Sequence, residues 1–326
     1  MKRCFLTGST GFIGSHFIEY ILKKTDWEIA ALDRRGTSGL PLDKRVIPVR
    51  GQLANFLHSP TAMKKQIGKV DYIVHMAART NVDESLYESY QFVRDNVDGT
   101  AALLEYIKKY HPDAKTCMFS SDEVMGPADP GVNFKENDKR RPSNPYAATK
   151  GAAELLAYSF AHSFGLKIFT VRCMNVYGER QAEVKFIPKV VQAFIEKRKI
   201  TLHGTSGENV ASRHWVHAKD CADAVVFLLD RAESEEIYHI AGGEENVYNL
   251  AYMIFKEMQG KYSHLDKFEN WIEWVDFHKA RPGHDRRYSL DAGKLKAMGW
   301  SPKHLLVNEL SKIIAHEVER FGRSGL

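Results

Sequence analysis

Short apolar runs alternate with longer segments of helical periodicity along the first half of the chain. Helical periodicity is clearest at residues 12–24, 88–110 and 144–164. The apolar runs have lengths typical of buried strands, and they lie at residues 2–7, 27–32, 46–49, 72–75, 115–120 and 167–173. Strands that alternate with helices in this way predict an α/β fold built on a doubly wound parallel sheet.

The pattern is less regular after Asn175. It predicts a strand at 200–203, a loop at 204–212, one more strand of the main sheet at 237–241, a Trp-rich segment at 268–277, and helices at 186–198, 218–231, 246–258 and 303–321. We expect two intimate units that the chain crosses more than once. Residues 1–174 and 213–243 would form the sheet domain, and residues 175–212 and 244–326 a smaller C-terminal α/β cap that binds substrate over the sheet.

A glycine-rich turn separates the first predicted strand from the first helix. Gly8, Gly11 and Gly14 form a GxxGxxG pattern within TGSTGFIG. The first glycine permits a tight turn, the second lets the backbone approach a pyrophosphate, and the third lets the helix pack on the strand. The helix N-terminus then faces the phosphates. The turn therefore predicts a Rossmann-type dinucleotide-binding domain in the sheet unit.

The second predicted strand ends in an acidic residue. Asp33 lies 19 residues after Gly14, where a carboxylate would hold the ribose hydroxyls of adenosine. This carboxylate favours NAD as the cofactor. Arg34 and Arg35 follow it and leave NADP open, because an arginine there could bind a 2′-phosphate.

The densest group of reactive side chains lies between residues 120 and 150. Ser121, Asp122 and Glu123 follow the fifth strand, where ligands bind in an open parallel sheet. Tyr146 and Lys150 are four residues apart, so they share one face if 144–164 is a helix. An ammonium beside a phenol should lower the pKa of Tyr146 from about 10 and produce a base for a hydroxyl proton. The two acids would add a second proton transfer.

Composition and charge narrow the possible environments. The 326 residues carry a net charge of +5, with no long run of like charge, so we expect neither nucleic acid nor membrane as a partner. No apolar run approaches the ~18 residues of a membrane span. The N-terminus enters a strand directly, which indicates a cytoplasmic protein. The four cysteines are far apart and predict buried free thiols in a reducing compartment: Cys4, Cys117, Cys173 and Cys221.

Several motifs together resemble the extended short-chain dehydrogenase/reductase family, and within it the nucleoside-diphosphate-hexose 4,6-dehydratases. The resemblance covers nearly the whole chain. It rests on TGSTGFIG, SSDEVMG, NPYAATK, RCMNVYG, LDAGKLKAMGW and, most discriminating, RPGHDRRY. It implies an NAD-dependent lyase that converts a dTDP- or UDP-glucose-type sugar nucleotide to its 4-keto-6-deoxy product.

The resemblance also implies a catalytic role for each reactive side chain. Tyr146 would take the C4 hydroxyl proton while hydride passes from C4 to NAD. Glu123 would remove the C5 proton, and Asp122, kept protonated, would protonate the leaving C6 hydroxyl. Ser121 would bind the C4 oxygen, and Lys150 would also hold the nicotinamide ribose. The hydride would then return to C6.

Binding residues are implied in the same way. For the cofactor they are Gly8, Gly11, Phe12, Ile13, Gly14, Asp33, Arg34, Gln52, Leu53, Ala77, Ala78, Asn96, Tyr146 and Lys150. For the sugar nucleotide they are Thr80, Asn175, Lys185, Arg213, Arg281 and His284. The charges of RPGHDRRY would also suit a surface salt-bridge loop. No metal is expected, because His214 and His217 have no third ligand nearby in the sequence.

Seven positions depart from the family pattern, mostly on the substrate side. Gln52 replaces an aspartate that holds the adenine amine, although an amide can still accept that hydrogen bond. Residues 79–81, Arg-Thr-Asn, replace Glu-Ser-His. Met125 replaces a tyrosine, Val184 a glutamate, and His214 an aspartate. These changes do not alter the expected reaction class, but they leave undetermined which sugar and which nucleotide base the substrate carries.

Two kinds of alternative remain open. A C4 epimerase on the same scaffold would need Tyr146 and Lys150 but no acid pair, and a uronate decarboxylase would want a cation such as Arg79 for the substrate carboxylate. A non-catalytic NAD-binding protein is the other alternative. The resemblance further implies a homodimer, formed through a four-helix bundle of the 88–110 and 144–164 helices.

Overall fold

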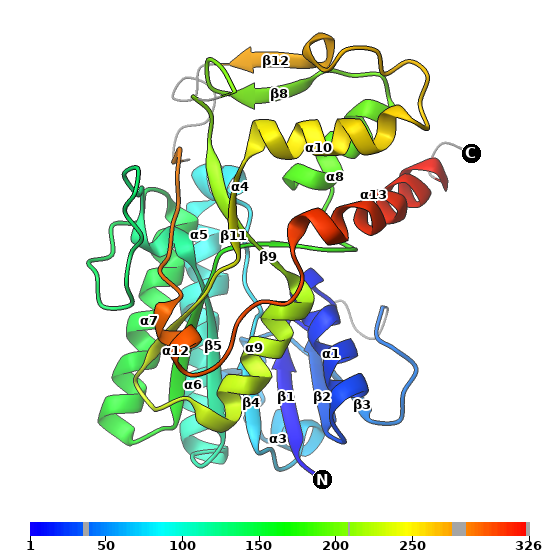
Figure 1. Cartoon of the computed structure of the whole chain (residues 1–326). Coiled ribbons are helices and arrows are strands. Elements are labelled where there is room, and N and C mark those ends of the chain that lie inside the picture. Colours follow the sequence, from blue (N-terminus) through cyan, green and yellow to red (C-terminus); the bar gives the residue numbers. More distant parts are fainter. Residues whose placement is uncertain (35–38, 208, 276–284, 324–326) are drawn as a thin grey trace.

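The computed structural model describes residues 1–34, 39–207, 209–275 and 285–323, and it shows a large sheet unit with a smaller unit above it (Figure 1). The sheet unit has seven parallel strands in the order β10-β6-β5-β4-β1-β2-β3. This order confirms the predicted doubly wound parallel sheet. The strands are β1 (Arg3–Thr7), β2 (Glu28–Asp33), β3 (Val46–Arg50), β4 (Tyr72–His75), β5 (Lys115–Ser121), β6 (Ile168–Cys173) and β10 (Ile237–Ile240).

Side chains of alternate residues on each strand enter two cores on opposite faces of the sheet. On β1, Cys4 and Leu6 join one core, and Phe5 joins the other. The first core is covered by α1 (Phe12–Lys24) and α9 (Ala218–Arg231), which pack side by side (Figure 1). The second is covered by α2 (Asn55–His58), α3 (Pro60–Ile67), α6 (Gly99–Tyr110) and α7 (Pro145–Phe164). The strand order reverses between β1 and β4, where such sheets bind ligands at their carboxyl ends.

The single helix predicted at 88–110 is interrupted. It consists of α5 (Ser89–Phe92), a π-helical turn η1 (Val93–Asp98) and α6, with α4 (Val82–Tyr87) just before it. The wide turn carries the buried side chain of Asn96. Its amide nitrogen donates to the carbonyl of Arg79 and to the hydroxyl of Thr149, both at 3.0 Å. The irregular turn therefore joins the loop after β4 to α7.

The smaller unit has its own core. Within the described residues it contains a three-stranded sheet, a two-stranded sheet and three longer helices (Figure 1). Each of these helices buries one apolar face in this core. The strands are β7 (Asn175–Tyr177), β9 (Ser212–His217) and β11 (Gly243–Asn246) in one sheet, and β8 (Ile200–His203) and β12 (Ile272–Val275) in the other. The helices are α8 (Phe186–Ile195), α10 (Val247–Gln259) and α13 (Leu306–Arg323). Three further short elements of the chain are η2 (Asp122–Met125), which follows β5 of the sheet unit, η3 (Phe268–Trp271) and α12 (Gly293–Ala297).

The cysteines agree with their interpretation from the sequence. All four are buried free thiols, and the sulfur atoms of Cys173 and Cys221 are 3.2 Å apart. Within the described ranges, no helix combines the length and the apolar character that crossing a bilayer requires.

Candidate active site

The glycine turn joins β1 to α1 at the carboxyl edge of the sheet. Gly8 has a φ of +73°, which favours glycine, and a Cβ there would lie 2.9 Å from the backbone nitrogen of Ala77. A Cβ on Gly14 would lie 2.2 Å from the carbonyl oxygen of Gly8. The close approach therefore requires both glycines. The first turn of α1 carries no acidic residue, so its backbone N–H groups can face an anion.

Polar groups beside this turn fit a dinucleotide. The hydroxyls of Ser9 and Thr10 are buried, and neither has a hydrogen-bond partner among the described residues. Asp33 accepts a hydrogen bond of 3.2 Å from the backbone N–H of Thr10, so its carboxylate lies next to the turn. Arg34 lies 3.8 Å from Asp95, so its guanidinium is directed toward α5 to α6. The arrangement therefore favours an unmodified adenosine ribose, and Arg35 lies outside the described residues.

His75 is a structural residue, in agreement with its position at the end of a buried strand. Its Nδ1 lies 2.7 Å from the hydroxyl of Thr7, and its Nε2 lies 3.1 Å from that of Thr100. Burial lowers the pKa of His75 to about 3, so the ring is neutral. The same Thr7 hydroxyl accepts from the backbone N–H of Ala77 at 3.1 Å, which fixes the start of the Ala77-Ala78 loop next to Gly8.

The other predicted cofactor residues have different surroundings. Gln52 is exposed, whereas Leu53 packs against α6, where a Cβ on Gly99 would lie 2.8 Å from it. Asn96 accepts from the backbone N–H of Arg79 at 2.8 Å and makes the two donor bonds already described, so its amide orients the loop after β4. Direct contacts of these residues with NAD stay predictions.

The hydroxyl and the two acids lie together where β5 ends and η2 begins. Ser121 Oγ accepts from the N–H of Glu123 at 3.3 Å and donates to Asp122 Oδ1 at 2.9 Å. Glu123 Oε2 accepts from Asn144 Nδ2 at 2.9 Å and lies 3.5 Å from the hydroxyl of Tyr288. Asp122 Oδ2 is buried with no hydrogen-bond partner among the described residues, so it can contact a ligand.

The two carboxyl groups differ in proton affinity. Burial and the charge of Glu123 raise the pKa of Asp122 to about 7, against a smaller lowering by the Ser121 hydrogen bond. Burial also raises the pKa of Glu123, but Asn144 and the positive charges of Lys185 and Arg213 act against it. Near neutral pH, Asp122 can therefore donate a proton as a carboxylic acid, and Glu123 beside it is the better proton acceptor.

Tyr146 and Lys150 lie on the first turns of α7, as predicted. The Tyr146 ring packs on Phe92, with ring centroids 6.5 Å apart. The expected lowering of its pKa is wrong: burial and the charges of Glu123 and Asp122 raise the pKa of Tyr146 above its ordinary value. Lys150 Nζ donates to the carbonyl of Phe119 at 2.5 Å, and burial lowers the pKa of Lys150 to about 8.

Arg213, predicted to bind the diphosphate, is held by the chain segment that follows residue 284. Its guanidinium donates to the carbonyl oxygens of Asp285 at 2.5 Å and Arg286 at 2.6 Å. It also lies over the ring of Tyr288, 4.7 Å from the ring centre. Arg213 therefore fixes Tyr288 near Glu123 and adds positive charge beside both acids.

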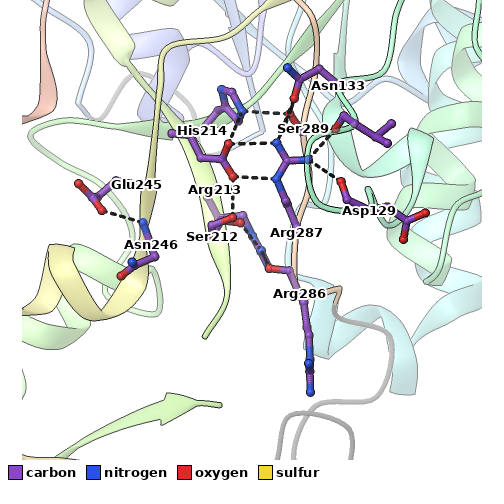
Figure 2. Close-up of polar contacts among 12 residues, drawn as sticks. Asp129, Asn133, Ser212, Arg213, His214, Glu245, Asn246, Arg286, Arg287 and Ser289 are labelled. Atoms are coloured by element: carbon purple, nitrogen blue, oxygen red, sulfur yellow. Dashed lines mark hydrogen bonds and ion pairs between the residues drawn. The ribbon is translucent and has the colours of Figure 1, made fainter. Parts of the chain in front are cut away.

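Arg287 ties the same segment to two others (Figure 2). Its guanidinium binds both carboxylate oxygens of Glu244 on β11, at 2.8 and 3.0 Å. It also donates to Asn133 Oδ1 and to the carbonyl of Asp129, each at 3.0 Å, and to the hydroxyl of Ser289 at 3.2 Å. This part of RPGHDRRY is thus an ion-pair loop that supports the site.

The remaining predicted substrate residues are placed as follows. Asn175 Nδ2 is buried and has no partner among the described residues, so it can donate to a ligand. Lys185 is exposed at the start of α8 and acts electrostatically on Glu123. Thr80 is exposed. Arg281 and His284 lie outside the described residues.

Arg79, at a position where the sequence departs from the family, is surrounded by carboxylates. It donates to Asp95 and to Glu88, both at 2.8 Å, and Glu84 lies 3.9 Å away. Its charge is therefore offset within the protein.

The two histidines considered as metal ligands have structural partners. His214 lies 3.0 Å from the carbonyl of Gly242 and 3.0 Å from the hydroxyl of Ser289. His217 caps α9 by accepting from the N–H of Lys219 at 3.0 Å. In the described part of the chain, no group of three or more His, Cys, Asp or Glu could hold a metal ion.

Two residues of this site were not assigned from the sequence. Asn144 and Tyr288 both approach Glu123, and the sequence marks only the motifs that contain them, NPYAATK and RPGHDRRY. Asn144 stands immediately before a proline at a helix start, a recognisable capping signal. The contacts with Glu123 depend on how distant segments pack, and no local pattern predicts them.

Comparison with known proteins agrees with this geometry. Residues 4–241 match the model of a family described as the NAD dependent epimerase/dehydratase family. The dTDP-glucose 4,6-dehydratase of Streptomyces antibioticus is 32% identical over 320 residues, which cover 95% of this chain and 90% of the relative. A low-salt glycan biosynthesis protein of Haloferax volcanii, Agl12, is 31% identical over 91% of this chain and 93% of its own. The crystal structure of dTDP-glucose 4,6-dehydratase from Streptomyces venezuelae, with NAD bound, is 29% identical, has a TM-score of 0.86 and covers 98% of each chain.

Proposed function

Because the chain belongs to the NAD-dependent epimerase/dehydratase family, we propose that it is a nucleoside-diphosphate-hexose 4,6-dehydratase. It converts a dTDP- or UDP-glucose-type sugar nucleotide to the 4-keto-6-deoxy product by C4 oxidation, loss of water across C5 and C6, and return of hydride to C6. Relatives named as dTDP-glucose 4,6-dehydratases, which match over 95% of the chain, support this reaction.

The observation that carries the proposal is the unequal pair of acids at the end of β5. Elimination needs one group that removes the C5 proton and another that protonates the leaving C6 hydroxyl. Asp122, with a pKa raised to about 7, is the acid, and Glu123, held by a neutral donor and two nearby cations, is the base. Ser121 orients Asp122 and binds the C4 oxygen.

Tyr146 and Lys150 serve the oxidation at C4. NAD supplies the hydride acceptor that later returns the hydride. Tyr146 takes the hydroxyl proton. Because the pKa of Tyr146 is raised in the protein alone, this transfer needs a positive charge beside the phenol that lowers its pKa when the ligands are bound. Lys150, fixed by the carbonyl of Phe119, has two further N–H donors for ribose hydroxyls. The glycine turn and Asp33 hold the adenosine end.

The alternatives are less consistent with these surroundings. A C4 epimerase requires Tyr146 and Lys150 but gives no role to a protonated Asp122 beside Glu123. A uronate decarboxylase needs a cation for the substrate carboxylate, and Arg79 is already paired with Asp95 and Glu88.

We also infer the setting in which the enzyme works. Residues 175–212 and 244–326 form the sugar-nucleotide-binding domain, and residues 1–174 and 213–243 the NAD-binding domain, apart from β9, which pairs with β7 and β11 in the sheet of the smaller unit. A homodimer formed through α5 to α7 is supported by exposed apolar side chains such as Tyr90 and Leu155, at 74% and 54% exposure. A cytoplasmic location is supported by the four free cysteines.

Product mass tests the proposed reaction. Purified protein is incubated with NAD and with dTDP-glucose, UDP-glucose or UDP-N-acetylglucosamine. We expect loss of one water without net reduction of NAD, and the preferred substrate identifies the nucleotide. Glu123→Gln should slow the water loss about 10²- to 10⁴-fold, because the base is removed while Tyr146 and Lys150 remain.

Other products would contradict the proposal. An unchanged mass with an altered sugar configuration would indicate an epimerase, and loss of carbon dioxide from UDP-glucuronate would indicate a decarboxylase. Water loss that is equally fast in Glu123→Gln would remove Glu123 from the mechanism.

A further inference from the structure

We propose that Asn144 is a positioning residue that joins the two halves of the catalytic machinery. One atom of its side-chain amide caps the helix that carries Tyr146 and Lys150, and the other holds the carboxylate of Glu123. This inference deepens the proposed dehydratase function and rests on it.

The first contact is with α7. Asn144 has extended backbone angles, φ −145° and ψ 161°, and stands before Pro145, the first residue of the helix. Its Oδ1 accepts from the backbone N–H of Ala147 at 2.8 Å. This bond satisfies one of the free N–H groups of the first turn, so it fixes the turn on which Tyr146 lies.

The second contact is with the base. Asn144 Nδ2 donates to Glu123 Oε2 at 2.9 Å, and Asn144 is only 5% exposed. The two contacts determine the orientation of the amide, because a flipped amide would turn N–H toward N–H and oxygen toward carboxylate. The cap on α7 and the position of Glu123 are therefore set by one rigid group.

Several charged and titratable groups also face Glu123. Asp122 and Asp285 are acids, Lys185 and Arg213 are cations, and Tyr146 and Tyr288 are phenols. The cations reach Glu123 by charge, and the Tyr288 hydroxyl is 3.5 Å away, whereas Asn144 is at normal hydrogen-bond distance. Asn144 thus orients the carboxylate and favours its ionised form without adding charge.

This link matters because the two bases act on adjacent carbons of one sugar ring. Tyr146 takes a proton from the C4 hydroxyl, and Glu123 takes one from C5. Asn144 couples their positions, since it is two residues from Tyr146 and bonded to Glu123. Losing the bond to Glu123 while keeping the cap should impair elimination and leave C4 oxidation intact.

Two substitutions separate these roles. Asn144→Ser keeps a capping oxygen but is too short to reach Glu123, and Asn144→Asp keeps the cap while directing negative charge at Glu123. We expect Asn144→Ser to have a wild-type melting temperature, whereas Asn144→Ala, which lacks the cap as well, should melt lower. Asn144→Asp should match the wild-type melting temperature only where Glu123 is neutral, because the two carboxylates repel each other once Glu123 is ionised.

The measurement compares the rates of C4 oxidation and of C5 proton removal in single turnovers. C4 oxidation should stay at the wild-type rate, and exchange of the C5 proton with deuterated solvent should slow about tenfold or more. In Asn144→Asp, the acidic limb of the pH profile of the elimination rate should shift to higher pH by about one unit, because the added negative charge raises the pKa of Glu123. Equal slowing of both steps, or an unshifted limb, would overturn the proposal.

A stability measurement separates this inference from the reaction itself. If the wild-type protein eliminates no water, the proposed function fails, but the contact is still testable. Above the pKa of Glu123, Asn144→Asp should be less stable than the double variant that adds Glu123→Gln, because the second change removes the repulsion. Glu123→Gln is therefore made both in the wild-type protein and in Asn144→Asp, and its effect on the free energy of unfolding is compared. If the two effects are equal, the side chains at 144 and 123 are not coupled, and the inference is wrong whatever the reaction.

Discussion

Asp122 and Glu123 are neighbours in the sequence with different surroundings at the residue scale. Asp122 is 5% exposed and is bonded through one oxygen to Ser121, while its other oxygen has no partner among the described residues. Glu123 has a donor from Asn144 and lies near two cations. Two identical functional groups therefore acquire opposite roles from burial and neighbours.

This difference predicts an effect of pH on stability. The folded pKa of Asp122 is raised from 3.8 to about 7, so its contribution to stability is full below the unfolded pKa and is lost as pH rises through the folded pKa. Asp122→Asn removes this loss. The variant should gain stability relative to wild type between about pH 5 and about pH 8, by up to about 3 kcal/mol.

Chemical denaturation at the two pH values measures this gain, and activity gives the complementary result. Asp122→Asn should slow elimination about 10²- to 10⁴-fold, because an amide cannot protonate the leaving hydroxyl. A stability difference that is constant with pH would show that Asp122 is not protonated in the folded protein.

The glycine turn shows at the element scale how a local sequence pattern determines structure. A strand, the glycine spacing and a helix are all readable within 25 residues, and the structure has them at β1 and α1. The packing of these two elements depends on the missing side chain of Gly14. Its Cβ would lie 2.2 Å from the carbonyl oxygen of Gly8.

Gly14→Ala should therefore displace the first turn of α1. We expect a loss of about 1–3 kcal/mol in stability, and an NAD affinity at least about tenfold weaker. Gly260→Ala is a matched control at the end of α10, because a Cβ there meets nothing within 4 Å and φ is −68°. Thermal unfolding and calorimetric titration with NAD would compare the two variants, and equal affinities would contradict this account.

Elements without a strong local pattern were harder to predict. The strands β7, β9 and β11 are three to six residues long and rich in polar side chains, and they pair across more than 25 residues of chain. The π-helical turn depends on Asn96 reaching Arg79 and Thr149, which are distant in sequence. The candidate catalytic residues lie in local motifs that the sequence shows, whereas Asn144 and Tyr288 meet Glu123 only through tertiary packing.

At the scale of the whole molecule, the site belongs to both units. The sheet unit supplies the acids at the end of β5 and the dyad on α7, while Arg213 and Tyr288 approach from β9 and the segment after residue 284. The two units are also joined away from the site, where Asp220 on α9 binds the ring and the backbone N–H of His304, at 2.7 and 2.9 Å. The positive charge of Arg213, from the smaller unit, therefore acts to lower the pKa values of Asp122 and Glu123 in the larger unit.

The arrangement of helices on the outer face of the sheet unit predicts self-association. In α7, Leu155 and Tyr158 are 54% and 51% exposed, and Tyr90 and Val93 of the adjoining α5 and η1 are 74% and 46% exposed. We expect the wild-type protein to be a dimer by light scattering, and Leu155→Lys combined with Tyr158→Lys to give monomers. Stability within one chain should change by no more than about 0.5 kcal/mol, because these side chains are exposed there. Val307→Lys on α13, where the valine is 66% exposed, is the control that should remain dimeric. A monomeric wild-type protein, or dissociation by Val307→Lys alone, would place the interface elsewhere or exclude it.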